Sequence, residues 1–213
     1  MTHRVLPITF ALVASAGLVG AQISTVDSVG NVGQFSSLTI GSDGLPLISY
    51  AALFNTTPSN LKVAHCNDLA CATSRTITTL DPDDGGNYTS IAVGADGLGL
   101  IAYMKATSSG QTLKVAHCQN AACTSATLTP LDTGMFAGID LAIGSDGLGL
   151  ISYYDVTNYD LKVAHCNNAA CTSATVTTLD PSPARGSYTT VAIGADGLGI
   201  IAYDSQPLAQ AQE

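Results

Sequence analysis

The sequence predicts an all-β fold, a β-propeller-like array of four-stranded antiparallel blades, of which three are complete and one is incomplete. Two motifs that recur with a period of about 50 residues support this prediction. The first motif surrounds an Asp-Gly pair and occurs four times, at 40–50, 93–103, 143–153 and 193–203. The second, Leu-Lys-Val-Ala-His-Cys followed by another Cys, occurs three times, at 61–71, 113–123 and 161–171. Repetition of this length indicates one array whose units bury their faces against each other.

The Asp-Gly motif predicts the first two strands of each blade. In the second copy, apolar runs at 88–94 and 98–103 flank the turn. An Asp-Gly pair between such runs is a strong hairpin signal, because Gly accepts the positive φ that the turn requires. Both alternating sets of side chains in these runs are apolar, which indicates that both faces of the sheet are covered.

The Cys-containing motif predicts the third and fourth strands. Residues 113–118 alternate in the way expected of a strand, with Leu, Val and His on one face. A turn at 119–122 leads into 124–131, which is rich in threonine and contains a proline, as suits an outer edge strand. The equivalent outer strands of the other copies are expected at 75–80 and 174–179.

The two ends of the chain complete the predicted organisation. Residues 1–21 have a basic start, an apolar run of about 15 residues and a small-residue cleavage site, which predict a signal peptide too short to span a bilayer. Residues 22–204 form the repeat domain, and 205–213 form a disordered tail. The repeats cover about 28–81, 82–132, 133–180 and 181–204. Segment 22–27 matches the end of the first outer strand, and is predicted to complete the last blade as its outer strand.

The incomplete blade leaves three arrangements open. The array can form a small closed ring, remain an open arc, or associate with another chain through its unpaired blade edge. No segment after the signal peptide is long and apolar enough to cross a membrane, so no membrane span is expected.

The cysteines predict both local bonds and a compartment. All six follow the signal peptide in three C-x4-C pairs, which favours the disulfides Cys66–Cys71, Cys118–Cys123 and Cys166–Cys171. Each closes a small loop, so its expected contribution is about 2 kcal/mol. A signal peptide with paired cysteines indicates a secreted protein, extracellular or periplasmic. The alternative, metal binding by the cysteines and their preceding histidines, requires ligands gathered from several copies.

The charge balance excludes some partners. The chain has 16 acidic and 7 basic residues and a net charge of −9, which argues against binding to nucleic acid or to an anionic membrane. Only 11% of the residues are charged and 46% are hydrophobic, which favours a folded domain.

The repeats resemble a known class of protein. Asp-Gly-x-Pro-x-Ile-Ser-Tyr at 43–50, Ile-Ser-Tyr-Tyr-Asp at 151–155 and Leu-Lys-Val-Ala-His-Cys are similar to repeats of secreted bacterial proteins of the sialidase-like (BNR-like) β-propeller type. The resemblance implies this fold over 22–204, and the class includes sugar hydrolases and lectins. A sialidase-like site would need three arginines, whereas only Arg75 and Arg185 follow the signal peptide. The only glutamate is Glu213, so a pair of glutamates is also excluded.

The loops between strands two and three, and between successive blades, differ from copy to copy and are expected to carry ligand binding. Near them the sequence places a ring of tyrosines, whose flat apolar faces and polar tips suit sugar or peptide ligands. The alternative is that this ring only packs the blades together. The candidate ligand-binding residues are Tyr50, Tyr103, Tyr153, Tyr154 and Tyr203. The repeated histidines and Asp-Gly aspartates are expected to have structural roles, and no catalytic residue is assigned.

One segment is a candidate metal site. Oxygen-bearing side chains at Asp81, Asp83, Asp84 and Asn87 are spaced so that they could hold calcium. The alternative is a solvated turn. No other cofactor is expected.

Together these observations predict a secreted, non-catalytic binding or interaction module that binds a glycan or a protein on its variable loops. Two alternatives stay open: a glycan-cleaving enzyme that uses aspartates, and a degenerate structural array without a ligand. Two Asp carboxyls within about 5 to 10 Å of each other in one pocket would favour the enzyme.

Overall fold

The computed structural model describes residues 23–54, 57–82, 85–107, 110–134, 136–181 and 185–205. These residues form fourteen β-strands and no helix. The predicted signal peptide and nearly all of the predicted tail lie outside this part of the chain. Within it, no helix is long and apolar enough to cross a membrane.

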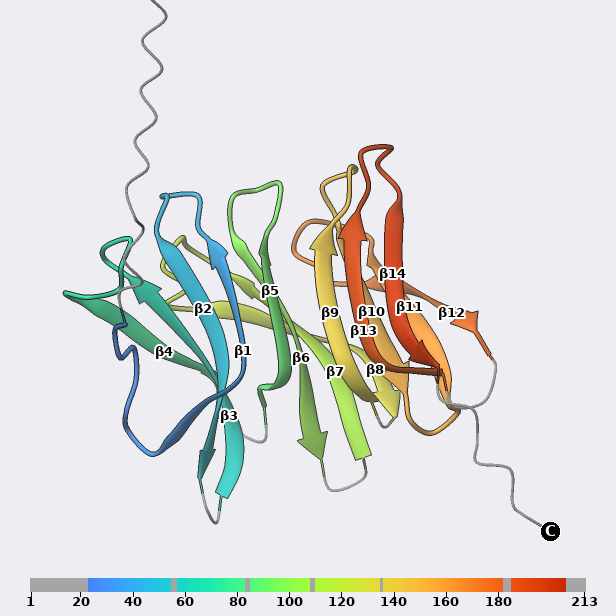
Figure 1. The fold of residues 1–213 in the computed structure, drawn as a ribbon, viewed down its shortest axis with the longest axis horizontal. Helices are drawn as coiled ribbons and strands as arrows, with labels where there is room; N and C mark the ends of the chain where they lie inside the picture. The colour runs from blue at the N-terminus through green and yellow to red at the C-terminus, as the bar shows by residue number, and fades with distance from the viewer. Residues whose placement is uncertain are drawn as a thin grey trace, which may run out of the picture.

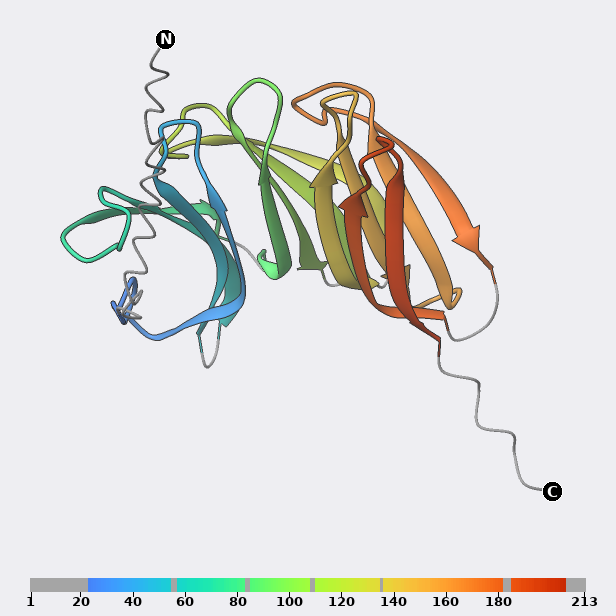
Figure 2. The same ribbon diagram turned by 45° about the horizontal axis from the view of Figure 1, so that its top comes forward.

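The strands form three four-stranded antiparallel sheets and one two-stranded sheet, which confirms the predicted fold class. The first blade contains β1 (Asn31–Ile40), β2 (Pro46–Phe54), β3 (Thr57–Cys66) and β4 (Arg75–Asp81). The second contains β5 (Asn87–Val93), β6 (Gly99–Thr107), β7 (Gly110–Cys118) and β8 (Ala126–Gly134). The third contains β9 (Phe136–Ile143), β10 (Gly149–Asp155), β11 (Asp160–Cys166) and β12 (Ala174–Asp180). The fourth sheet contains β13 (Arg185–Ile193) and β14 (Gly199–Ser205). Figures 1 and 2 show the sheets side by side like blades, with the first blade and β14 at opposite ends.

The Asp-Gly turns join the first two strands of each blade as predicted. Their glycines have φ values between 78° and 81°, in the left-handed region that favours glycine. In each turn the Asp carboxylate accepts a hydrogen bond from the backbone N–H two residues later, for example from Leu98 to Asp96 at 3.0 Å. The turn is therefore closed by its own side chain as well as by the backbone.

The second repeated turn, between the third and fourth strands, contains the three predicted disulfides. The bonded cysteines have Cα atoms 4.8 to 5.0 Å apart. An Asp or Asn side chain inside each turn accepts backbone hydrogen bonds, as Asn120 does from Thr124. The outer strand of the second blade begins at Ala126, two residues later than predicted, because the disulfide turn extends to that point.

The innermost strands β1, β5, β9 and β13 are neighbours along the array. On each of β1, β5 and β9, one polar side chain accepts a hydrogen bond from a backbone N–H of the innermost strand of the following blade. These bonds run from Ile91 to Ser37 (3.2 Å), from Leu141 to Ser90 (3.1 Å) and from Val191 to Asp140 (2.8 Å). The blades are therefore held in register with each other at their inner edges.

A close contact between a leucine and a glycine recurs at each blade boundary. An added Cβ at Gly99 would lie 2.9 Å from Leu47 Cδ2, and one at Gly149 would lie 2.8 Å from Leu100 Cδ2. The same contact joins Gly199 to Leu150, at 2.6 Å. The second strand of each later blade therefore begins with a glycine because the preceding blade approaches its backbone.

The N-terminal segment differs from the prediction for 22–27. Residues 23–30 form no strand, and Asp27 lies against Tyr50 and Lys62 of the first blade. The fourth sheet contains only β13 and β14 among the described residues. The sequence match with the first outer strand nevertheless has a structural meaning, because Asp27 makes the same contact as the aspartate that ends that strand.

Candidate functional site

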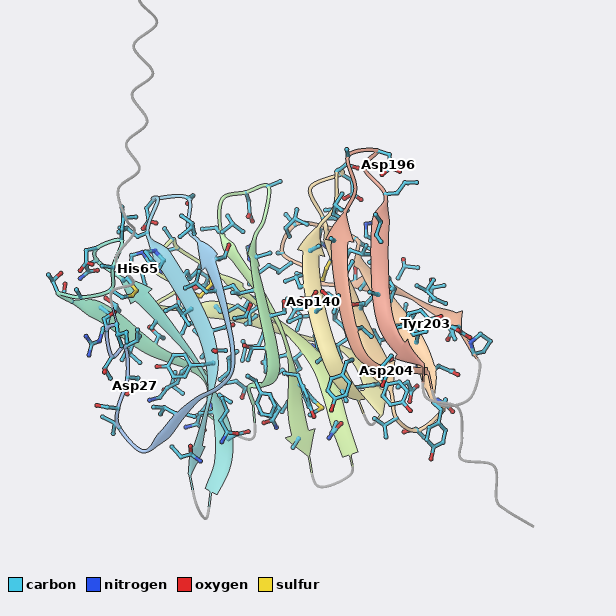
Figure 3. The ribbon with its side chains drawn as sticks, viewed as in Figure 1. Asp27, His65, Asp140, Asp196, Tyr203 and Asp204 are labelled. Carbon is cyan, nitrogen blue, oxygen red and sulfur yellow. A yellow bond between two sulfur atoms is a disulfide. The ribbon has the colours of Figure 1, made fainter. Side chains whose placement is uncertain are left out.

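The two ends of the blades differ in chemistry. We call the end with the Asp-Gly and disulfide turns the turn face. The opposite end, with the loops between second and third strands and the connections between blades, is the loop face. Figure 3 shows His65 toward the turn face and Asp27 toward the loop face of the first blade. Likewise Asp196 and Tyr203 lie at opposite ends of the fourth sheet.

On the turn face, each repeated histidine pairs with the Asp-Gly aspartate of its own blade. Nε2 of His65 lies 2.7 Å from Oδ2 of Asp43. The equivalent pairs are His117 with Asp96 at 2.7 Å and His165 with Asp146 at 2.8 Å. The third strand is thus tied to the turn between the first two, which agrees with the structural role expected of both residue types.

On the loop face, each repeated tyrosine donates a hydrogen bond to an aspartate that precedes its blade in the chain. Tyr103 of β6 binds Asp81 at the end of β4, at 2.8 Å. The equivalent pairs are Tyr50 with Asp27 (2.8 Å), Tyr153 with Asp132 (2.8 Å) and Tyr203 with Asp180 (2.9 Å). In every pair except that of Tyr50 with Asp27, the aspartate belongs to the preceding blade, so the bond crosses a blade boundary. We call all four Asp–Tyr pairs clasps and number them in chain order.

The clasp tyrosines are mostly buried. Tyr103 and Tyr153 are fully buried and Tyr50 is 3% exposed, while Tyr154 is also buried and Tyr203 is partly buried. Burial raises the pKa of the first three, and the hydrogen bond to a carboxylate raises it further. This placement supports the packing interpretation. Ligand binding by these rings stays a prediction.

Lysines on the third strands, joined in the second blade by Lys105 of β6, extend the clasps into small charged clusters. In the first, Lys62 binds Asp27 at 3.1 Å. In the second, Lys105 and Lys114 bind Asp81 at 2.8 and 2.6 Å. In the third, Lys162 binds Asp155 at 2.8 Å and Asp132 at 3.4 Å. The first cluster therefore contains one acid and one lysine. The second contains one more lysine than acids, and the third contains one more acid than lysines.

These partners determine the protonation of the buried acids. Burial by itself would raise the pKa of Asp81, but hydrogen bonds from Lys105, Lys114 and Tyr103 outweigh it and hold that pKa below the ordinary value. Burial also opposes ionisation of Asp155, and its bonds from Lys162 and Asn158 likewise lower its pKa. Both carboxyl groups are therefore ionised at neutral pH.

The third cluster bears on the enzyme alternative, because it brings two Asp carboxylates to one ammonium group. A glycosidase needs one carboxyl group that stays protonated near neutral pH. The lowered pKa of Asp155 is the opposite of that requirement. Burial opposes the charge on Lys162, but its bonds to the two acids raise its pKa, so the lysine is charged as well. Lys162 and the two aspartates therefore form an ion-paired contact between the second and third blades.

The candidate calcium ligands are only partly within the described residues. Asp83 and Asp84 lie outside them, and Asn87 begins β5. The carboxylate of Asp81 is engaged by two lysines and a tyrosine. Among the described residues, no group of three or more His, Cys, Asp or Glu side chains is placed to hold a metal ion. Calcium binding at this segment stays a prediction.

A cavity of about 270 Å³ lies beside the first clasp. It is lined by Thr25, Val26, Asp27, Val32, Gly33, Ser36, Ile48 and Tyr50. The pairing of β1 with β2 shifts register between Val32 and Gln34 and again between Gln34 and Ser37. Bulges of this kind often lie next to binding sites, because they redirect side chains and interrupt strand pairing. The cavity combines one carboxylate, three hydroxyl groups and several apolar side chains.

Sequence reasoning identified Tyr50 at this cavity and missed most of its other lining residues. Asp27 had a usable signal, because an aspartate precedes the tyrosine of every Asp-Gly motif by a similar interval. The residues of β1 gave none, since the register shift between Gln34 and Ser37 recurs between Asn87 and Ser90 and does not mark the first blade.

Comparison with known proteins supports the fold. No protein-family model and no curated protein matches the sequence. Among solved structures, a protein of unknown function from Dyadobacter fermentans matches with a TM-score of 0.61 and 11% identity, over 79% of this chain and 56% of that one. An endo-1,4-β-xylanase from Bacteroides thetaiotaomicron matches with a TM-score of 0.53 and 12% identity, over 79% and 64%. An endo-arabinase from the same organism gives 0.50 and 10%, over 79% and 68%.

At these identities the similarity shows the fold alone. It supports a β-propeller-like arrangement of blades, and it is not specific to the sialidase-like class that the repeats resemble. This chain spans 56% to 68% of the length of the three matched chains. The three disulfides are typical of an oxidising environment outside the cytoplasm.

Proposed function

We propose that this protein is a secreted binding protein without catalysis of its own, and that it binds a small polyhydroxylated ligand, the size of one sugar residue, beside the first blade. The cavity next to Asp27 and Tyr50 is the observation that supports this proposal most directly. Ligand sites are typically concave and mainly apolar, with a few polar groups that fix the ligand's orientation.

The lining residues match the two kinds of surface that a sugar presents. Val32 and Ile48 offer apolar contact to its C–H groups, and Thr25 and Ser36 offer hydroxyl groups that both donate and accept. Burial opposes ionisation of Asp27, but bonds from Val29, Tyr50 and Lys62 outweigh it and hold its pKa below the ordinary value. Asp27 is therefore an ionised acceptor for ligand hydroxyl groups.

The absence of catalysis is proposed from the charged clusters. The acids at the first three clasps are paired with lysines, and those with a shifted pKa are shifted toward ionisation. General-acid catalysis needs the opposite shift. The fold itself is compatible with glycan ligands, since an endo-arabinase and an endo-1,4-β-xylanase share it.

The test is calorimetric titration of the purified, oxidised protein with a panel of monosaccharides. Thr25→Val removes one hydroxyl group from the cavity at nearly constant volume, and should weaken binding about fivefold through the loss of one hydrogen bond. Ser36→Phe should abolish binding by filling the cavity.

The matched control is Thr79→Val. Thr79 occupies the equivalent position before Asp81 and is exposed, so this change should leave affinity unaltered. Failure of the wild-type protein to bind any sugar would contradict the ligand class. Equal weakening by Thr25→Val and Thr79→Val would contradict the location of the site.

A further inference from the structure

Each blade has two faces that meet those of its neighbours. We call the side toward the next blade in the chain the trailing face, and the side toward the preceding blade the leading face. At the boundary between the second and third blades, Leu100 of the trailing face and Leu141 of the leading face both lie against Gly149. Both leucines belong to one buried cluster. Leu47 and Ile91, at the same two repeat positions, belong to the buried cluster at the boundary between the first and second blades. The residues at these positions therefore form the core of both joints.

The same two repeat positions are exposed at the ends of the array. Ile200 of β14 is equivalent to Leu100 by its place in the motif, and is 62% exposed, compared with 0% for Leu100. Leu38 of β1 is equivalent to Leu141, and is 60% exposed, compared with 6%. The register confirms the second equivalence, because both residues pair with the isoleucine of the second strand, Ile48 or Ile151.

Other exposed apolar side chains extend both end faces. Leu198, two residues before Ile200 in the chain, is 66% exposed. On β1, Ile40 is 52% exposed. Arrays of repeats normally need a polar outer face on their terminal units to stay soluble. The end faces of this array keep the apolar residues of an internal joint, which is the mark of a surface that binds a protein partner.

We propose that the trailing face formed by β13 and β14 binds the leading face formed by β1 and β2 of a second copy of this chain. The chain carries both faces that such a joint needs. Each of its three internal boundaries already joins the trailing face of one blade to the leading face of the next. Figure 1 places β1 and β14 at opposite ends of the molecule, so the two faces meet between copies. Two copies joined head to tail at both ends form a closed dimer.

The residues that differ at the end joint are compatible with this pairing. Pro46 stands at the start of β2, where the later blades have the glycine that accepts a leucine from the preceding blade. Ile200 stands where the other copies have that leucine. Each end face therefore carries one substitution relative to the internal joints, at two positions that meet there.

The inference does not rest on the proposed ligand and is tested by mass, although the leading face shares Ile48 and Tyr50 with the cavity. Light scattering on the purified, oxidised protein over a wide range of concentration should show a dimer. Ile200→Asp and Leu38→Lys should each give a monomer, because a charge buried against an apolar surface would weaken association at least about a hundredfold. Both positions are exposed in the single chain, so circular dichroism should be unchanged. The unfolding midpoint should fall only by the amount that the loss of dimerisation accounts for.

Mixing the two variants tests the head-to-tail geometry. A mixed dimer has one joint with both substitutions, Asp opposite Lys, and one joint with neither, so the mixture should recover dimers. Leu69→Asp is the control, since Leu69 is 76% exposed in a disulfide turn and away from both faces. A wild-type protein that is monomeric throughout would overturn the proposal. So would a mixture that stays monomeric, or a variant at one face that leaves the dimer intact.

Discussion

The turn face and the loop face use the same chemistry, an aspartate bound by a polar side chain, with different consequences. On the turn face, Asp96 and His117 belong to one blade, and their side chains are 30% and 12% exposed. On the loop face, Asp81 and Tyr103 belong to neighbouring blades, and both are almost fully buried. The first kind of contact holds a single hairpin against its third strand, whereas the second joins one blade to the next.

This difference shows which contacts set the order of the blades. A within-blade pair is local and partly hydrated, so water can replace a lost partner at small cost. A clasp is desolvated, so a partner left alone keeps its desolvation penalty. The stability of the array should therefore depend on the loop-face aspartates much more than on those of the turn face.

The largest expected effect comes from Asp81→Asn. This change leaves Lys105 and Lys114 without their carboxylate in a buried position, and should lower the free energy of unfolding by about 3 to 5 kcal/mol. Chemical denaturation followed by circular dichroism gives the value.

The control for this prediction is Asp96→Asn on the turn face, which makes the same chemical change where side chains are partly hydrated. It should cost about 1 kcal/mol or less. Equal losses for the two variants would contradict the distinction between the faces.

Acidification should weaken the loop face, and also the turn face, where the pKa values of Asp43 and Asp146 are lowered too. The folded-state pKa values of Asp81 and Asp155 lie below the ordinary value of 3.8, so the unfolded chain binds more protons between the lowered and the ordinary pKa. The stability that these groups contribute is complete above the ordinary pKa and is lost as the pH falls through the lowered one. The loss from each group is larger the further its pKa is lowered. Urea unfolding at neutral pH and at several values below the ordinary pKa measures it.

The same titration on Asp81→Asn separates the contributions. Since one of the responsible groups is gone, the variant should lose less stability on acidification than the wild-type protein. Parallel declines in the two proteins would show that the clasp at Asp81 is not the source of the acid sensitivity.

The blade pattern could be predicted from the sequence because its determinants are local. Gly97 and the pair Cys118–Cys123 mark turns within one hairpin, and the structure places a turn at each. The clasps depend on residues more than 20 positions apart and in different blades, so strand alternation does not indicate them. Their signal was the recurrence of an aspartate at or near the end of each outer strand, which also underlies the match of segment 22–27 with the first outer strand.

The first-blade cavity and the end faces could not be predicted in the same way. The cavity depends on how the segment around Asp27 packs against β1 and β2, since the positive φ values of Gly33 and Phe35 recur at Gly86 and Tyr88 of the second blade. The exposure of Ile200 depends on the three-dimensional array, because its sequence is nearly that of the buried Leu100 motif. A repeated sequence predicts a repeated fold, and the departures appear only where a neighbour is missing.

The smallest expected change in stability comes from removing a tyrosine hydroxyl group. It distinguishes a clasp between two four-stranded blades from the clasp of the two-stranded fourth sheet. Tyr103→Phe and Tyr203→Phe each remove one hydroxyl group that binds an aspartate. Tyr103 is fully buried, so its loss should lower the free energy of unfolding by about 1 to 1.5 kcal/mol. Tyr203 is only partly buried beside a two-stranded sheet, so water can replace its hydroxyl group, and the loss should be about 0.5 kcal/mol or less. Denaturation midpoints of the two variants, measured side by side, test the difference. A larger loss for Tyr203→Phe would mean that the fourth sheet is as strongly joined as the internal blades.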